Sequence, residues 1–395
     1  MLRFMRVAVL VVALLIVAFG LSVGCLGIFA SLLNPGADQL LGITGGVALL
    51  VLTVALGLAL AWQARQAIRG RGSSPFLPGR VWPLVVVFLL ALALGQAILS
   101  MNLLPALTFP LLHLVVAVTP SLIVLALAGR SLAGLTRWRD IVLQTSSGAF
   151  LATVISFVLE MVAGLGLIIA VSALVAMQPG GQELLQSLAD RLQSPAGLED
   201  PAFLSSLVQS PVVIGLALLA LAIMVPLIEE ATKTLGIGLM AYRRITMAQA
   251  FLWGVAAGAG FALAEGLLST LGGLDGWVVA MLSRIGATMM HCFVGGVMGL
   301  AWYYVLSEQR WGRGLKLYAA SVGLHGLWNA LAGGLTLLSL RVTDTALAGA
   351  GQAGIALALF VLLALLVMLA VAVTVGLVRL TRYVRLHSAA VVQGT

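Results

Sequence analysis

The chain has 395 residues, of which 62% are hydrophobic and only 9% are charged, and its mean hydropathy is +1.15. Soluble domains carry about 25% charged residues, so this composition excludes an ordinary soluble protein. The apolar runs are long and do not alternate, which excludes a membrane β-barrel. The sequence therefore predicts an all-α polytopic membrane protein in a lipid bilayer. The net charge of +8 follows membrane topology, so we expect no nucleic-acid partner.

Runs of about 20 apolar residues predict about ten transmembrane helices. In chain order they cover residues 7–33, 40–62, 81–101, 107–128, 148–177, 210–242, 246–270, 277–306, 316–339 and 352–378. The first run is too long for the core of a signal peptide, so we expect it to be retained as a span. Ten spans place both termini on the same side of the membrane.

Basic residues collect in alternate loops, which predicts that both termini are cytoplasmic. Seventeen of the 21 Lys and Arg residues fall on this side: Arg3, Arg6, Arg65, Arg69, Arg71, Arg80, Arg130, Arg137, Arg139, Arg243, Arg244, Arg310, Arg313, Lys316, Arg379, Arg382 and Arg385. Arg191 and Arg341 are the two in the opposite loops. We therefore expect a multi-pass protein of the cell membrane.

The chain divides into four regions by its pattern of spans. Residues 1–178 form an N-terminal five-span region, and residues 179–209 form an extracytoplasmic loop with a short helix near residues 183–192. A four-span core follows at residues 210–340, and residues 341–395 hold the last span and a basic tail. The two cysteines lie in apolar segments, which argues against a disulfide framework or a thiolate metal site.

The sixth span, AIMVPLIEEATKTLGIGLMAYRR, carries two glutamates and a lysine in an apolar segment. An ionisable group near the centre of a span costs at least about 2.5–3.5 kcal/mol, so such groups are retained where they pair or function. Glu229 and Lys233 stand four residues apart and are expected to pair, whereas Glu230 points about 100° away and needs another partner. Pro226 predicts a kink or local opening just before the glutamates.

The next three spans add further polar residues. Glu265 follows a glycine-rich stretch that allows close helix contact, and Arg284 and His291 stand seven residues apart on one face. His325 and Asn329 share a face of the ninth span. A rise of about 1.5 Å per residue puts these side chains between the midplane and the outer half of the membrane. We expect the four helices to share one polar cavity.

Each of these residues also has a purely structural interpretation. Glu229 with Lys233 could be a structural ion pair, Glu265 a buried protonated carboxyl, and Asn329 a bridge between helices. A lone intramembrane histidine often only packs, and Phe261 is expected to pack. No partner is visible in the sequence for three other polar residues, Glu160, His113 and Cys292.

A carboxylate and a histidine can activate a water molecule, and a second histidine with an amide can donate to an oxyanion. These are the parts of a peptide hydrolase without a covalent nucleophile. The same residues could instead hold Zn²⁺, with Glu230, Glu265, His291 and His325 as candidate ligands. No HExxH motif and no nucleophile elbow is present.

Four motifs occur in order on consecutive spans: EEATK at residues 229–233, GFALAE at residues 260–265, the Arg284 and His291 pair, and HGLWN at residues 325–329. Together they resemble the PrsW family of intramembrane proteases, which is distantly similar to the CAAX-prenyl and bacteriocin-processing membrane proteases. The resemblance covers about residues 211–340. It implies an intramembrane protease acting on membrane-anchored proteins such as anti-sigma factors.

The resemblance also implies roles for individual residues. Glu229 or Glu230 would activate the water, and His325 with Asn329 would stabilise the oxyanion. Glu265 stands where the relatives place a histidine, so His291 is the candidate for the missing imidazole. Two supporting residues are expected, Lys233 and Arg284. The motifs leave open a metal-free glutamic mechanism and a Zn²⁺-dependent one.

Two alternatives use the same residues differently. A proton- or cation-coupled transporter would use the buried carboxylates as a relay. A membrane scaffold would use the cluster for partner binding alone. The absence of a clear internal repeat argues against a transporter built from inverted repeats.

Overall fold

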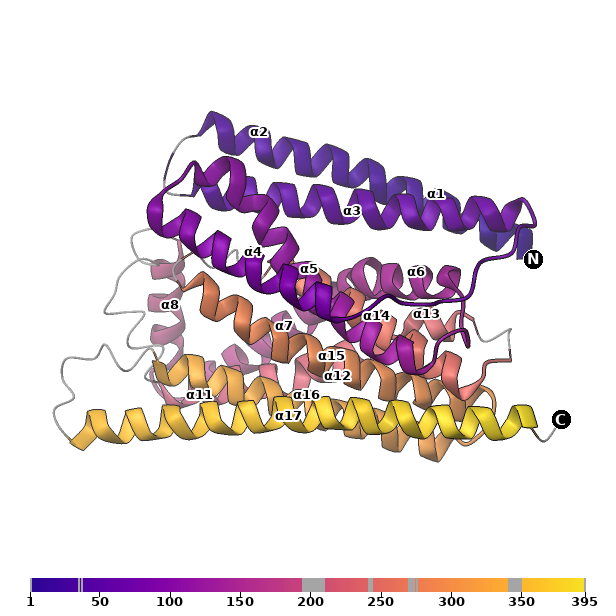
Figure 1. Cartoon of the computed structure of the whole chain (residues 1–395). Helices are drawn as coiled ribbons and strands as arrows, with labels where there is room; N and C mark the ends of the chain where they lie inside the picture. The colour runs from indigo at the N-terminus through magenta and orange to yellow at the C-terminus, as the bar shows by residue number, and fades with distance from the viewer. Residues whose placement is uncertain are drawn as a thin grey trace. The chain divides into compact units, whose positions relative to one another are not determined.

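The computed structural model describes residues 2–34, 36, 38–193, 210–240, 244–268, 274, 276–339 and 350–393. Helices make up nearly all of this part, as expected where backbone groups cannot bond to water. The helices (Figure 1) are α1 Leu2–Phe19, α2 Cys25–Leu33, α3 Gln39–Ile68, α4 Trp82–Met101, α5 Pro105–Ser131, α6 Trp138–Ser146, α7 Thr153–Ala176, α8 Gly181–Leu192, α11 Pro211–Leu219, α12 Val225–Lys233, α13 Leu235–Gly238, α14 Met247–Leu268, α15 Trp277–Leu306, α16 Trp311–Ser339 and α17 Ala350–Gln393. The all-α prediction is confirmed.

Three π-helical turns interrupt this pattern, at η1 Gly20–Gly24, η2 Ser147–Ala152 and η3 Ala220–Met224. Each joins two α-helices into a longer rod, so α1 with α2, α6 with α7, and α11 with α12 form single spans. A π-turn widens the helix and frees backbone groups, and such turns are common at functional sites. The turn η3 lies one helical turn before Glu229 and Glu230.

Nine of the described helical rods are long and apolar enough to cross a membrane. They match nine of the ten predicted spans, and the helix near residues 183–192 is present as α8. The exception is α16, which has 29 residues but a more polar composition. It carries Lys316, His325 and Asn329, so the site residues themselves lower its hydropathy.

The chain separates into two compact units. Unit 1 comprises Met1–Thr153, Glu230–Ser321 and Ala370–Thr395, and unit 2 comprises Val154–Glu229 and Val322–Leu369. The chain passes between the units inside helices, once between the consecutive residues Glu229 and Glu230 of α12. Each unit is therefore described by itself.

In unit 1, α14 is the central helix, and it packs against α5, α6 and α15. In an 18-residue apolar stretch of α14, 89% of the residues are buried. The helix has large core side chains such as Phe251 and Trp253. Glycines bring α14 against α15, because a Cβ on Gly258 would overlap the backbone at His291. The predicted close helix contact is thus confirmed for these two helices.

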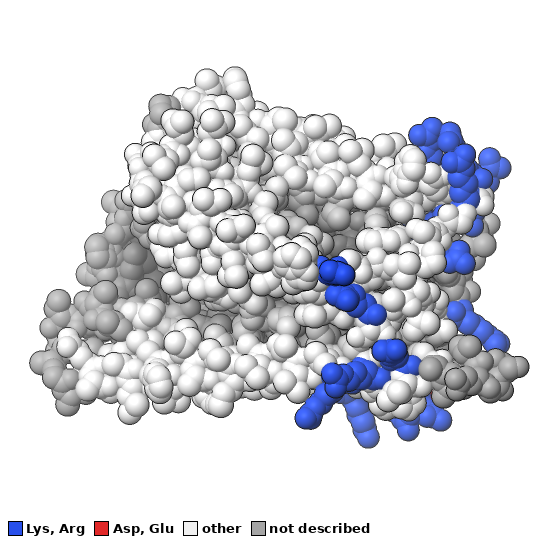
Figure 2. All heavy atoms as spheres, viewed as in Figure 1, with Lys and Arg blue, Asp and Glu red and all other residues white. Residues whose placement is uncertain are grey.

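The basic residues of the predicted inner loops that the structure describes all belong to unit 1. On the face drawn in Figure 2 they gather toward one end of the unit. Arg6 donates to the carbonyl of Ala67 at 2.8 Å, and Arg139 donates to that of Arg71 at 2.8 Å, so three predicted inner segments meet there. Two of the basic residues, Arg243 and Arg341, lie outside the described residues.

Gly258→Ala is expected to lower the thermal unfolding temperature of the protein in detergent or nanodiscs. The added methyl group would overlap the α15 backbone and push α14 away from it. The matched control is Gly323→Ala on α16, where a Cβ meets nothing within 4 Å. Alanine is a better helix former than glycine by about 1 kcal/mol, so the control should be neutral or stabilising. Equal melting temperatures for the two variants would contradict this packing.

Candidate active site

The helix α12 presents both glutamates and ends at Lys233. Thr234 interrupts the helix, and its hydroxyl accepts a hydrogen bond from the indole Nε1 of Trp302 on α15 at 2.9 Å. Thr234 and Lys233 are fully buried. The end of α12 is therefore anchored to α15 inside unit 1.

Lys233 pairs with Glu230, three residues before it, at 2.6 Å between Nζ and Oε1. The sequence predicted Glu229 as the partner of Lys233, and the pairing that the structure describes within unit 1 is with Glu230. Residues three apart also share a helix face, and both Glu230 and Lys233 are 0% exposed, so each needs an opposite charge. Lys233 Nζ also lies 2.9 Å from Nδ1 of His291 and 4.5 Å from the ring centre of Phe261.

His291 continues this network on its other ring nitrogen. Its Nε2 lies 2.7 Å from Oε2 of Glu265, and the same carboxylate oxygen accepts from the guanidinium of Arg284 at 3.0 Å. The side chain of Glu265 is 42% exposed, whereas that of His291 is 3% exposed. Five of the predicted residues thus form one chain of contacts that runs from the partly exposed Glu265 to the buried Glu230.

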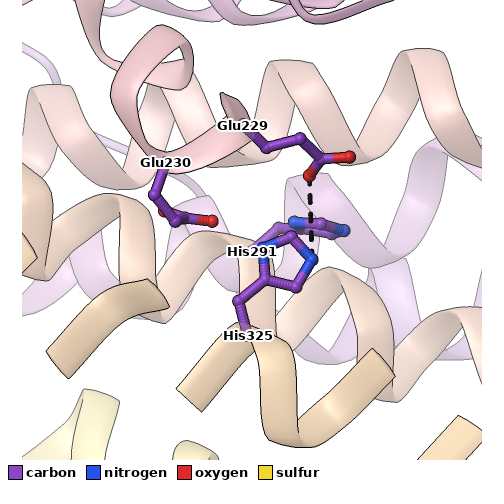
Figure 3. Close-up of side chains that lie close together, drawn as sticks. All are labelled: Glu229, Glu230, His291 and His325. Atoms are coloured by element: carbon purple, nitrogen blue, oxygen red, sulfur yellow. Dashed lines mark ion pairs between the residues drawn. The ribbon is translucent and has the colours of Figure 1, made fainter. Parts of the chain in front are cut away.

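Unit 2 holds two further predicted site residues, the acid Glu229 and the imidazole of His325. Oε2 of Glu229 on α12 lies 3.7 Å from Nε2 of His325 on α16 (Figure 3). Both side chains are buried. This separation exceeds a direct hydrogen bond. It suits two ligands of one ion, because donors about 2.1 Å from a tetrahedral Zn²⁺ lie about 3.4 Å apart.

The predicted opening near Pro226 is present as the π-helical turn η3. Pro226 has no N–H, so it cannot donate to the carbonyls four and five residues before it, those of Ala222 and Leu221. Asn329 on α16 donates from Nδ2 to the carbonyl of Leu221 at 3.0 Å. A Cβ on Gly326 would overlap the Ala222 carbonyl, so α16 packs closely on this turn.

Two aromatic residues contribute more than sequence reasoning assigned to them. Phe261, expected only to pack, places its ring beside the Lys233 ammonium and near His291. Its position one helical turn before Glu265 was the available signal. Tyr318 on α16 lies near enough to Glu230 to feel its charge, and no sequence signal identified it. His113, by contrast, accepts a hydrogen bond from Trp277 at 3.1 Å within a cluster of aromatic rings.

Four buried residues of the described chain carry the donor types that a metal ion would need: Glu229, Glu230, His291 and His325. Figure 3 draws their side chains. Imidazole nitrogens and carboxylate oxygens are standard ligands of Zn²⁺. The chemistry of each of these four side chains therefore agrees with metal binding. The four include Glu229 in place of Glu265, whose carboxylate contacts His291 and Arg284 instead.

The family described as PrsW family intramembrane metalloprotease matches residues 137–374. The chain belongs to this family. The match covers more than half of the sequence and is wider than the expected resemblance over residues 211–340, since it includes the fifth predicted span and most of the last. No curated protein and no solved structure matches the chain.

PrsW membership makes the chain a peptidase of the membrane and supports the protease prediction over the transporter and scaffold alternatives. The description of the family as metalloproteases agrees with the donor chemistry of the buried glutamates and histidines. A membrane-protein substrate follows from the class of enzyme.

Asn329→Ala should lower the stability of the protein by about 1 kcal/mol, because the carbonyl of Leu221 loses its donor at the π-turn. Thermal unfolding measures this change. Thr336→Ala on the same helix is the control, since its hydroxyl donates only to Ala332 within that helix. An Asn329→Ala protein as stable as the control would show that this bond does not support η3.

Proposed function

We propose that the chain is an intramembrane endopeptidase that hydrolyses a peptide bond of a membrane-anchored protein. One observation carries the proposal. Consecutive residues of α12, Glu229 and Glu230, each belong to a contact network that contains a histidine of the same unit. The peptide bond between the two glutamates joins these networks covalently, which supports a single acid and imidazole centre.

The donor set has one member more than a catalytic metal needs. Catalytic zinc sites use three protein ligands and keep the fourth position for water. A bound metal would lower the pKa of that water and polarise the scissile carbonyl. Of Glu229, Glu230, His291 and His325, three would therefore hold the ion. The remaining carboxylate, Glu229 or Glu230, would take the proton from the water.

The other predicted residues orient this centre. Arg284 holds the Glu265 carboxylate, which in turn fixes the ring of His291. Asn329 has two amide hydrogens, so the bond to Leu221 leaves one that can donate to an oxyanion. In a metal-free mechanism His325 would act beside it, as the family resemblance implies. Lys233 neutralises the buried Glu230.

The substrate proposal follows from the family and from the depth of the residues. Polar groups within the membrane suit a cleavage site in or next to a transmembrane segment. Membrane-anchored proteins of the anti-sigma-factor type are therefore the substrate class to test. We place the enzyme in the cell membrane with both termini in the cytoplasm, because the described basic residues gather at one end of unit 1. The four-region division of the chain remains a prediction.

Glu229→Gln, Glu230→Gln and His325→Ala should each abolish cleavage of a single-span substrate reconstituted with the purified protein. Metal content, measured on the same samples by elemental analysis, separates the roles. A ligand substitution should remove both metal and activity, whereas substitution of the general base should remove activity and leave the metal bound.

The control for these variants is Glu183→Gln on α8, an exposed carboxylate outside the site. It should cleave like the wild type. Full proteolysis by Glu229→Gln together with Glu230→Gln would reject the catalytic assignment. Proteolysis that survives exhaustive chelation, with no metal in the protein, would instead favour the metal-free glutamic mechanism.

The orientation is tested with reporters that are active on one side of the membrane only. Fusions after residue 395 and before residue 1 should report the cytoplasm, and an insertion beside α8 should report the opposite side. Basic residues are retained on the cytoplasmic side, which is the physical reason for this expectation. A C-terminal reporter outside the cytoplasm would overturn the proposed topology.

A further inference from the structure

Both ring nitrogens of His291 are engaged within unit 1, and the chemistry of the partners fixes their roles. The Lys233 ammonium has only hydrogen-bond donors, so Nδ1 of His291, 2.9 Å away, must accept. A carboxylate only accepts, so Nε2, 2.7 Å from Oε2 of Glu265, must carry the hydrogen. Nδ1 is therefore the ring nitrogen with the lone pair.

The contact on Nε2 matches the usual surroundings of a metal-binding histidine. Such a histidine donates its second ring N–H to a carboxylate, which fixes the tautomer and the ring orientation. Glu265 supplies that carboxylate, and Arg284 holds it at 3.0 Å. Nδ1 is then the nitrogen that faces a metal. In this structure the Lys233 ammonium lies on that nitrogen.

The same ammonium lies on Glu230, the second donor of this unit. Lys233 Nζ is 2.6 Å from Oε1 of Glu230, and both side chains are 0% exposed. The Lys233 ammonium lies between a carboxylate oxygen and an imidazole lone pair. A divalent cation shared by Glu230 and His291 would bind at the same position. A metal ion and the Lys233 ammonium at the same two ligand atoms would repel each other strongly in a buried site.

We propose that Lys233 is the resident counter-cation of the metal-free site and competes with the metal ion for Nδ1 of His291 and Oε1 of Glu230. This inference rests on the proposed metal-dependent function. A bound metal would take the place of the Lys233 ammonium at His291. The ring of Phe261, whose centre is 4.5 Å from Nζ, keeps a favourable contact for the displaced charge.

The proposal predicts that a variant without the Lys233 charge binds metal more tightly but is less stable when no metal is bound. Removing the charge of Lys233 should strengthen metal binding, because the ammonium then no longer competes for the two ligand atoms. It should also weaken the metal-free protein, because Glu230 loses its buried partner. If Lys233 instead held the ligands in place for the metal, its removal would weaken metal binding.

The experiment uses the purified full-length chain in nanodiscs, with Zn²⁺ alone and a chromophoric chelator as competitor. Lys233→Met should bind Zn²⁺ about ten-fold or more tightly than the wild type, the scale on which neighbours of metal ligands act. Its metal-free form should melt at a lower temperature. The control is Lys316→Met, because Lys316 is the chain's other lysine and is exposed. Its affinity should equal that of the wild type. Equal or weaker binding by Lys233→Met overturns the proposal.

A second measurement needs no variant of Lys233 and so does not depend on its folding. With only two lysines in the sequence, ¹⁵N-lysine labelling gives two side-chain Nζ resonances, and Lys316→Arg assigns them. Equimolar Zn²⁺ should shift the Lys233 resonance and leave that of Lys316 unchanged. A Lys233 resonance that stays in place while the protein takes up Zn²⁺ overturns the proposal.

The outcomes also separate this inference from the proposed function. If the wild type binds Zn²⁺ and His325→Ala does not, while Lys233→Met binds no more tightly, then the competition fails and the metal site stands. If neither the wild type nor Lys233→Met binds Zn²⁺, the metal site and the competition both fail. Proteolysis by the metal-free protein would then be the part of the proposed function that survives.

Discussion

The buried ion pair between Glu230 and Lys233 is the interaction on which the rest of the site depends. Both side chains are fully buried, and a single charge left in that place would destabilise the fold by several kcal/mol. The pair neutralises the charge of Glu230, and the Lys233 ammonium also contacts His291. His291 is in turn fixed by Glu265 and Arg284. The end of α12 that belongs to unit 1 therefore shares one electrostatic network with α14 and α15.

Helix geometry explains how these groups come together. Small residues let α14 and α15 approach closely, and His291 lies at that contact, where a Cβ on Gly258 would overlap its backbone. In unit 2 the loss of an N–H at Pro226 is accompanied by the widened turn η3, and Asn329 donates to a carbonyl of that turn. The same features that weaken an ordinary helix, glycine and proline, give polar side chains of neighbouring helices access to each other.

Much of this could be predicted from the sequence, because hydrophobicity and helical spacing are local properties. Runs of apolar residues predicted the helices, and the motifs EEATK and HGLWN predicted which helices carry the polar groups. Pairing could not be predicted in the same way. Lys233 is compatible with a glutamate three or four residues before it, and its contact with His291, which is distant in the sequence, cannot be read from helical spacing. The proximity of Tyr318 to Glu230 was missed because residues this far apart in sequence are brought together only by the tertiary fold.

Glu265 illustrates how a substitution in a motif can preserve chemistry. By the family resemblance drawn from the sequence an imidazole is expected at this position, and a carboxylate there would be a poor replacement if it had to act alone. The structure instead joins Glu265 to His291 at 2.7 Å, so an acid and an imidazole act as one unit across two helices. The Glu265 side chain is partly exposed, whereas the His291 ring is buried and contacts Lys233 through Nδ1. The acid on α14 therefore orients an imidazole from α15, and the position in the motif keeps its connection to the site through a hydrogen bond.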